Sequence, residues 1–145
     1  MGNQNNSNPY SKIEYYLYNY NLLESKIEEL ESIKATSEYN QNYTKWIKNK
    51  SSSLEDQVIR NINKEKRICK LKKWKALLSF VIEHYKNSDN LKYKYIQYKY
   101  FECLNSSEIE SKLNIDKYKQ KDIKAEILHY IFLICIKKNM LKEVN

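Results

Sequence analysis

The residues best suited to chemistry are hydroxyl, phenol and amine side chains gathered between positions 106 and 124. They are Ser106, Ser107, Lys117, Tyr118, Lys119, Lys121 and Lys124. Serine hydroxyls and helix N-terminal amides donate hydrogen bonds to phosphate oxygens, and lysines neutralise phosphates or reach base edges in a groove. These residue types predict binding to a polyanion, and double-stranded DNA is the expected partner.

Two consecutive helices are expected to position these side chains. Ser107 and Glu110 have the Ser-x-x-Glu spacing of a capping box, so either Ser106 or Ser107 is the expected N-cap of a short helix. Asn114 tolerates a left-handed backbone, and Asp116 can cap a second, longer helix. The apolar positions of that second helix are Ile123, Ile127, Ile131 and Ile134. A short helix, a tight turn and a helix with a lysine-bearing first turn indicate a helix-turn-helix.

The composition favours an all-α fold. The 145 residues include one Gly and one Pro, whereas sheet proteins need many turns that use these residues. This length is typical of one domain, or of one domain with a helical appendage. The net charge of +8 comes from an excess of lysine, which favours nucleic acid over a merely solubilising surface.

Enzymatic function is not expected. The only glycine is Gly2, so a glycine-rich phosphate loop is excluded, and neither His84 nor His129 has a flanking catalytic constellation. No catalytic residue and no cofactor is predicted.

The three cysteines predict buried thiols in a reducing cytosol. Cys69, Cys103 and Cys135 are widely spaced, form no C-x-x-C pair and have apolar sequence neighbours. A zinc site needs four close ligands, which these cysteines and the two histidines do not supply. No metal site is expected.

The sequence predicts a cytoplasmic protein without a membrane partner. Residues 1–8 are polar and precede no apolar signal region, and Asn6 stands where N-myristoylation needs Ser or Thr. The longest apolar run, Ile127–Ile136, has about half the length of a bilayer span and is expected to be a buried helix.

The first part of the chain predicts a disordered tail over residues 1–11 and a coiled-coil-like antiparallel helical hairpin over 12–86. The first helix has apolar residues spaced 3, 4, 3, 4 and 3 apart: Ile13, Tyr16, Tyr20, Leu23, Ile27 and Leu30. Such a narrow seam must pack on a helix of the same chain or of a second chain, and both remain open.

Residues 35–50 are expected to connect the two arms of the hairpin. Ser51–Ser53 mark the start of the second arm, with Ser52 and Glu55 as a further capping box. One long helix with a polar middle is predicted from Leu54 to about Tyr85, and a break near Asn63 is the alternative.

Asn87–Asn90 is the expected boundary of a C-terminal unit over residues 91–145. Residues 91–101 alternate like a strand, but they also have helical spacing at Ile96, Tyr100 and Leu104. Their lysine and tyrosine residues are also typical of platforms that stack single-stranded nucleic acid. A helix is favoured because its surroundings are helical and a DNA-binding unit needs a helix here.

The C-terminal unit resembles the sigma-70 region 4-like domain of phage-type late-gene transcriptional regulators of the RinA and ArpU kind. The matching residues are Lys99–Phe101, Ser107–Leu113, Asn114, Ile115 and Lys117–Lys124. The chain departs from that pattern at Gln120, where an apolar anchor is usual, and at Glu110, where a small residue is usual.

The resemblance implies a sequence-specific DNA-binding regulator, an activator of phage or mobile-element genes, with the helix after Asp116 in the major groove. The alternatives are a sigma-like adaptor that binds RNA polymerase and a helical assembly protein such as a phage small terminase subunit. A homodimer is expected through the seam Ile13–Leu30 or the run Ile127–Ile136, although the hairpin could cover that run within one chain.

Overall fold

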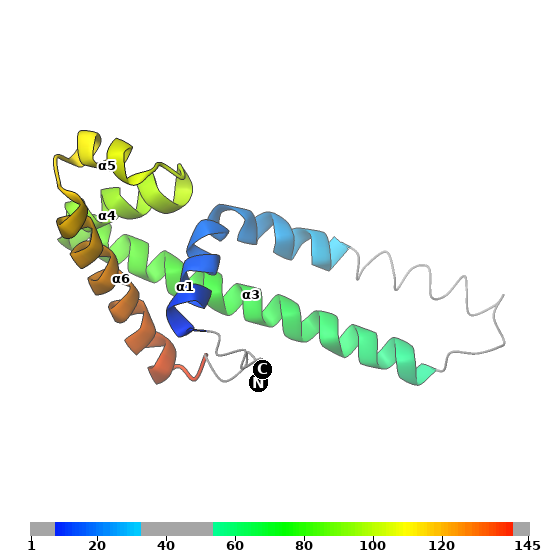
Figure 1. The fold of residues 1–145 in the computed structure, drawn as a ribbon. Helices are drawn as coiled ribbons and strands as arrows, with labels where there is room; N and C mark the ends of the chain where they lie inside the picture. The colour runs from blue at the N-terminus through cyan, green and yellow to red at the C-terminus, as the bar shows by residue number, and fades with distance from the viewer. Residues whose placement is uncertain (1–7, 33–53, 141–145) are drawn as a thin grey trace, which may run out of the picture. The chain divides into compact units, whose positions relative to one another are not determined.

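The computed structural model describes residues 8–32 and 54–140. All regular elements in these two ranges are helical, which confirms the all-α prediction (Figure 1). They are α1 (Pro9–Tyr18), a helical segment over residues 20–32, α3 (Leu54–Ser88), α4 (Asn90–Ile96), the π-helical turn η1 (Gln97–Phe101), α5 (Ser106–Leu113) and α6 (Lys117–Lys137). The expected connector over 35–50 and the helix start at 51–53 lie outside the described residues, as do residues 1–7 of the expected tail.

The N-terminal helix begins earlier and ends sooner than the sequence pattern predicts. It starts at Pro9, inside the segment expected to be a tail, because the Asn8 side chain accepts a hydrogen bond from the Tyr10 amide and proline suits the first turn. It ends at Tyr18, and its C-cap is Asn19, whose side-chain Nδ2 donates a hydrogen bond to the carbonyl of Tyr15 at 2.7 Å. Asparagine side chains compete in this way with helical backbone bonds, so the expected continuous helix is two helices.

The chain forms two compact units that differ from the predicted division into 12–86 and 91–145. Unit 1 contains the residues through Asn21 together with those from Ala76 onward, and unit 2 contains Leu22–Lys75. The difference arises because α1 packs on η1 and α6, far along the chain, while α3 has residues in both units. The prediction of one uninterrupted helix from Leu54 is confirmed.

Unit 2 pairs the helical segment 20–32 with the part of α3 that precedes Ala76. Its buried apolar residues are Leu23, Ile27, Leu30, Ile68, Leu71 and Trp74. Two ion pairs flank this seam: Lys72 with Glu31 at 2.8 Å, and Lys75 with Glu24. The later α3 residue pairs with the earlier residue of the segment, so the two helices run antiparallel here.

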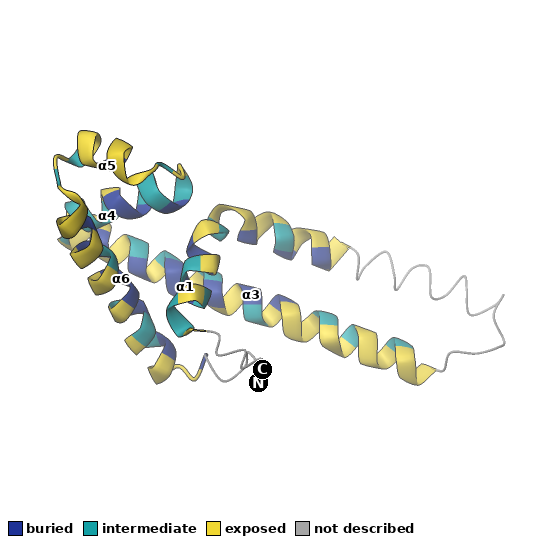
Figure 2. Ribbon diagram, viewed as in Figure 1, coloured by how far each residue is buried: buried dark blue, intermediate teal, exposed yellow. Residues whose placement is uncertain are grey.

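Unit 1 has a core enclosed by several helices. Within it α1 contacts α6 and η1, α4 contacts α5 and α6, and α5 contacts α6. Its most deeply buried side chains are Ile13, Leu17, Leu77, Leu78, Val81, Ile96, Tyr100, Ile109, Ile127, Ile131 and Cys135. Figure 2 shows these buried positions in dark blue and an exposed, yellow surface over α5 and the start of α6.

The ambiguous segment 91–101 is helical, as predicted, but its last turn is a π turn. The Glu102 amide donates to the Gln97 carbonyl at 2.9 Å, five residues back. This wider turn directs Tyr100 into the core and stacks Phe101 on Tyr20, with ring centroids 5.5 Å apart. A π turn thereby fastens α4 to the N-terminal residues.

The expectation of three buried cysteines is wrong for two of them. Cys69 and Cys103 are exposed, and only Cys135 is buried, where loss of hydration raises the pKa of its thiol to about 11.

Within the described ranges, no helix combines the length and apolar character needed to cross a membrane.

Candidate functional site

The start of α5 is capped by Asn105, and the predicted capping box of Ser107 with Glu110 is wrong. The Asn105 side chain accepts a hydrogen bond from the Glu108 amide at 2.9 Å, and the Asn105 amide donates to the Glu108 carboxylate at 3.4 Å. Asparagine provides the same acceptor as serine, so an Asn-x-x-Glu box beginning two residues earlier takes the place of the serine box. Neither Ser106 nor Ser107 is the N-cap.

The turn between α5 and α6 has the predicted construction. Asn114 adopts the left-handed conformation, with φ 56° and ψ 45°, and its amide donates to the Glu110 carbonyl at 2.8 Å. Asp116 then caps α6, because its carboxylate accepts a hydrogen bond from the Lys119 amide at 2.7 Å. Both ends of the turn are therefore fixed by hydrogen bonds.

Gln120 joins α5, the turn and α6 from a buried position. It is 5% exposed, the only buried polar residue of the described ranges. Its Oε1 accepts a hydrogen bond from the Ser106 hydroxyl, and its Nε2 donates to the carbonyls of Ser106 and Ile115, at 3.0, 3.0 and 3.3 Å. The departure from an apolar anchor thus has a physical reason, since three hydrogen bonds satisfy the buried amide.

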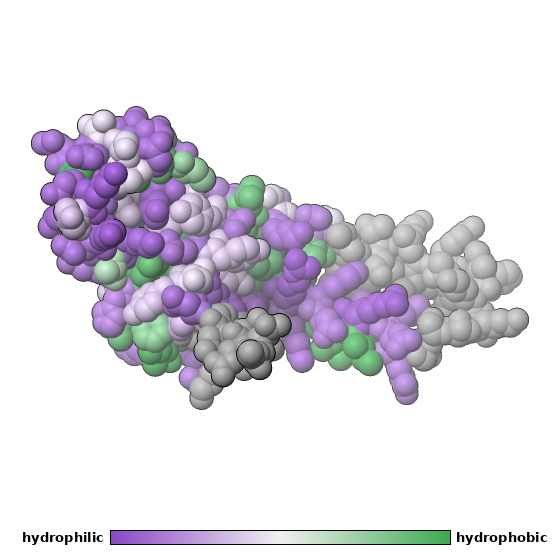
Figure 3. Space-filling view, viewed as in Figure 1, coloured by the Kyte–Doolittle hydropathy of each residue, from purple (hydrophilic) through white to green (hydrophobic). Residues whose placement is uncertain are grey.

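The predicted lysines form an exposed surface on the first turns of α6. Lys117, Lys119 and Lys121 are exposed and make no ion pair with any described residue, and the Tyr118 ring is 79% exposed. Figure 3 shows this end of unit 1 as largely hydrophilic. These four residues are brought together as the sequence predicts.

Lys124 belongs to a different surface from the other predicted lysines. It is partly buried and its ammonium lies 3.6 Å from the Glu14 carboxylate on α1. Ser106 is likewise engaged through its hydroxyl, whereas Ser107 is exposed at the start of α5. Ser107 is therefore the better placed of the two serines to donate to an incoming phosphate.

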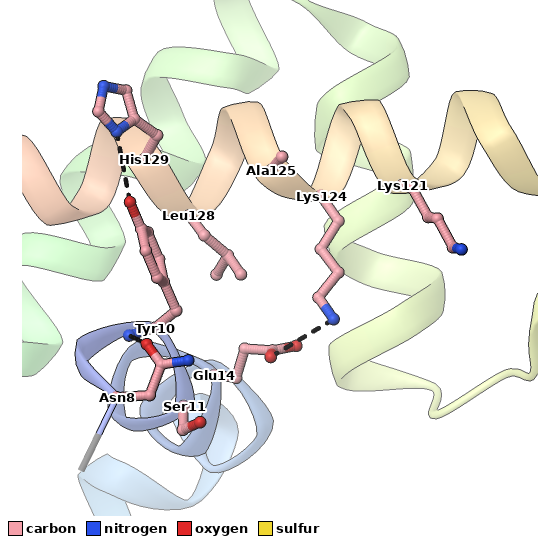
Figure 4. A pocket seen from close by; sticks show the side chains of 9 residues that line it. All are labelled: Asn8, Tyr10, Ser11, Glu14, Lys121, Lys124, Ala125, Leu128 and His129. Carbon is pink, nitrogen blue, oxygen red and sulfur yellow. Dashed lines mark hydrogen bonds and ion pairs between the residues drawn. The ribbon is translucent and has the colours of Figure 1, made fainter. Parts of the chain in front are cut away.

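A groove between α1 and α6 adjoins the lysine surface. It has a volume of about 680 Å³. Its lining residues are Asn8, Tyr10, Ser11, Glu14, Lys121, Lys124, Ala125, Leu128 and His129. Figure 4 shows Lys124 directed toward Glu14, and the Tyr10 hydroxyl within 3.5 Å of the His129 ring nitrogen Nδ1.

Glu14 fixes the position of α1 and was not predicted as a site residue. Its second carboxylate oxygen accepts a hydrogen bond from the Tyr100 hydroxyl at 2.8 Å. Burial, with a further contribution from the negative charge of Glu14, raises the pKa of the Tyr100 phenol. No local sequence signal points to this contact, because its partners are 86 residues apart.

No cluster of three His, Cys, Asp or Glu side chains suited to a metal ion occurs in the part of the chain that the structure describes.

Comparison of the chain with known protein families, curated proteins and solved structures gave no match. The function is therefore argued from the geometry of the site.

Proposed function

We propose that this protein is a sequence-specific DNA-binding transcriptional regulator whose α5, turn and α6 act as a helix-turn-helix. One observation supports the proposal most directly: Lys117, Tyr118, Lys119 and Lys121 are exposed together on the first turns of a capped helix. The major groove of DNA admits a helix, and base edges there are read by side chains of the first turns. Because these lysines form no ion pair with any described residue, their binding to DNA also releases counterions from the phosphate backbone.

Each side chain has its own role in this proposal. Lys121 and Tyr118 reach toward base edges, Lys117 and Lys119 toward phosphates, and Ser107 donates to a phosphate at the α5 N-terminus. Lys124 contributes to the field of the site while paired with Glu14. Gln120 links α5, the turn and α6 through its hydrogen bonds and is the positioning residue of the proposed unit.

The resemblance to phage-type late-gene regulators extends the proposal. The protein activates transcription in the bacterial cytoplasm, has no catalytic activity, and binds DNA as a homodimer. The helices that precede its DNA-binding part correspond, in this proposal, to the N-terminal helical part of such regulators.

The test begins with selection of a binding sequence from random DNA. Lys121→Ala should then weaken binding to the selected sequence by about 1–3 kcal/mol if Lys121 reaches a base edge. Lys86→Ala, which removes an equal charge from the exposed end of α3, is the matched control and should have a smaller effect. Equal losses on selected and random DNA would make Lys121 a phosphate contact.

Absence of DNA binding at low salt would overturn the proposal. Co-purification with RNA polymerase in the absence of DNA would favour the adaptor function instead.

A further inference from the structure

One exposed face of α6 has a regular stripe that the proposed DNA contacts do not use, and one residue of the stripe, His129, also borders the groove between α1 and α6. We call this stripe the α6 outer stripe; its residues are Asp122, Glu126, His129, Leu133 and Ile136. They are spaced 4, 3, 4 and 3 apart, which is the spacing of a coiled-coil seam. All five are exposed, with Leu133 at 51% and Ile136 at 52%. Figure 3 shows apolar, green surface near the C-terminal end of α6.

The charges along the stripe run from acidic to basic. Asp122 and Glu126 occupy its first part, Leu133 and Ile136 its apolar part, and Lys137 and Lys138 follow directly after it. A second copy of the same helix, laid antiparallel, brings the acidic part of each stripe beside the lysines that follow the apolar part of the other. Such a self-complementary surface is what a twofold-symmetric interface requires.

We propose that two copies of this chain dimerise through their α6 outer stripes, antiparallel, with His129 opposite Leu133 of the second copy. In this register Glu126 lies within one residue of Lys137 of the second copy. Glu126 also pairs with Lys92 of its own chain at 2.7 Å, yet its side chain remains 61% exposed and available to a second cation. The partner of the stripe is therefore another copy of this chain.

The register sets the distance between the two DNA-reading surfaces. The twofold axis of the antiparallel pair passes beside residue 131 of each copy. Gln120, at the middle of the lysine surface, lies eleven residues before that position. At 1.5 Å per residue, two such lengths placed end to end separate the reading surfaces by about 33 Å. Successive major grooves on one side of DNA are about 34 Å apart, so each copy reads one half-site. This spacing rests on the proposed function, whereas the dimer itself does not.

The dimer is tested by sedimentation equilibrium at micromolar concentration. The wild-type protein should have the mass of two chains, and Leu133→Glu should weaken association by at least about tenfold, because an apolar contact is lost and a charged side chain is desolvated in its place. Phe80→Glu is the matched control: Phe80 is 58% exposed on α3, outside the stripe, and its change should leave association unaltered. Circular dichroism of each variant verifies that it is folded.

A charge exchange tests the antiparallel register without altering Leu133 or Ile136. Lys137→Glu should weaken association, and adding Glu126→Lys to the same chain should restore it. A monomeric wild type, or a double variant no better than Lys137→Glu, would overturn the proposal.

DNA probes separate this inference from the proposed function. Probes that carry two copies of the selected half-site with their centres one helical turn apart should bind the wild type more tightly than probes whose half-site centres are one and a half turns apart. Leu133→Glu should lose that preference and keep binding to a single half-site. A dimer that binds no DNA would end the proposed function and leave the dimer. DNA binding by a monomer would end the dimer, together with the homodimer part of the proposed function, and leave the DNA-binding helix-turn-helix. Preference for another spacing would overturn the register.

Discussion

Units 1 and 2 bury similar residues in different ways, although α3 contributes to both. In unit 1 the core residues Leu17, Ile127 and Ile131 are 0% exposed because helices surround them on several sides. In the described part of unit 2, two helices share one seam, and Leu71 remains 9% exposed. Farther toward the start of α3 the apolar residues Leu54, Val58, Ile59 and Ile62 are exposed. The comparison teaches that an apolar stripe on a helix is enclosed only where helices from distant parts of the chain meet it.

The largest expected effect comes from a cavity in unit 1. Ile127→Ala should lower the free energy of unfolding by about 2–5 kcal/mol, because the enclosed core cannot collapse into the space left. Ile27→Ala in unit 2 should cost less, since a seam of two helices can close over the missing atoms. Denaturant unfolding followed by circular dichroism measures both. Equal losses in the two variants would remove the proposed difference between the units.

A smaller effect is expected at the hydrogen-bonded centre of the α5–α6 pair. Gln120→Ala should cost about 1–3 kcal/mol, because the Ser106 hydroxyl and two carbonyls lose their partner in a partly buried place. Gln120→Leu restores the volume and should cost less. Adding Ser106→Ala to Gln120→Leu should recover part of the loss, and a double variant less stable than Gln120→Leu would contradict the hydrogen-bond account.

Much of the helical pattern could be predicted from the sequence because it depends on local chemistry. The scarcity of Gly and Pro, the left-handed Asn114, the Asp116 cap and the uninterrupted α3 all follow from residue type and spacing. The lysines on the first turns of α6 were also predicted, because a cap determines which residues follow on the first turns. The break at Asn19 was missed, since the 3, 4 spacing continues across it.

The remaining features depend on contacts between distant residues. Glu14 meets Tyr100 and Lys124 through tertiary packing, and no periodicity of α1 distinguishes that glutamate from its neighbours. Gln120 looked like a departure from an apolar anchor because its partner Ser106 lies 14 residues away. Apolar neighbours likewise did not reveal that Cys103 is exposed, because neighbours in sequence point in different directions.

The smallest expected effect is a loss of stability at alkaline pH. It should be greater in unit 1, which contains buried tyrosines, than in unit 2. Tyr85, Tyr95 and Tyr100 are buried in unit 1, and loss of hydration is the main cause that raises each phenol pKa above the ordinary 10.0. The unfolded chain ionises at lower pH than the folded chain. Their stabilisation is therefore complete below pH 10 and declines as the pH rises toward the folded pKa values.

The expected decline above pH 10 is on the order of 1 kcal/mol per pH unit for each such phenol. The described residues of unit 2 include no tyrosine, so the loss should begin in unit 1. Denaturant midpoints measured across this range, together with tyrosinate absorbance, test it. Tyr95→Phe should reduce the slope, and Tyr118→Phe, at an exposed position, is the control. A stability that stays flat above pH 10 would contradict the assignment.

The π turn at Gln97–Phe101 has a consequence for how this fold could have evolved. A π turn is an α-helix with one residue inserted, and each residue of an α-helix rotates the chain by about 100°. A relative lacking that residue would turn the counterpart of Tyr100 away from Glu14 and lose the stacking of Phe101 on Tyr20. Insertion or deletion of a single codon would thus create or remove the contacts through which η1 binds the N-terminal residues.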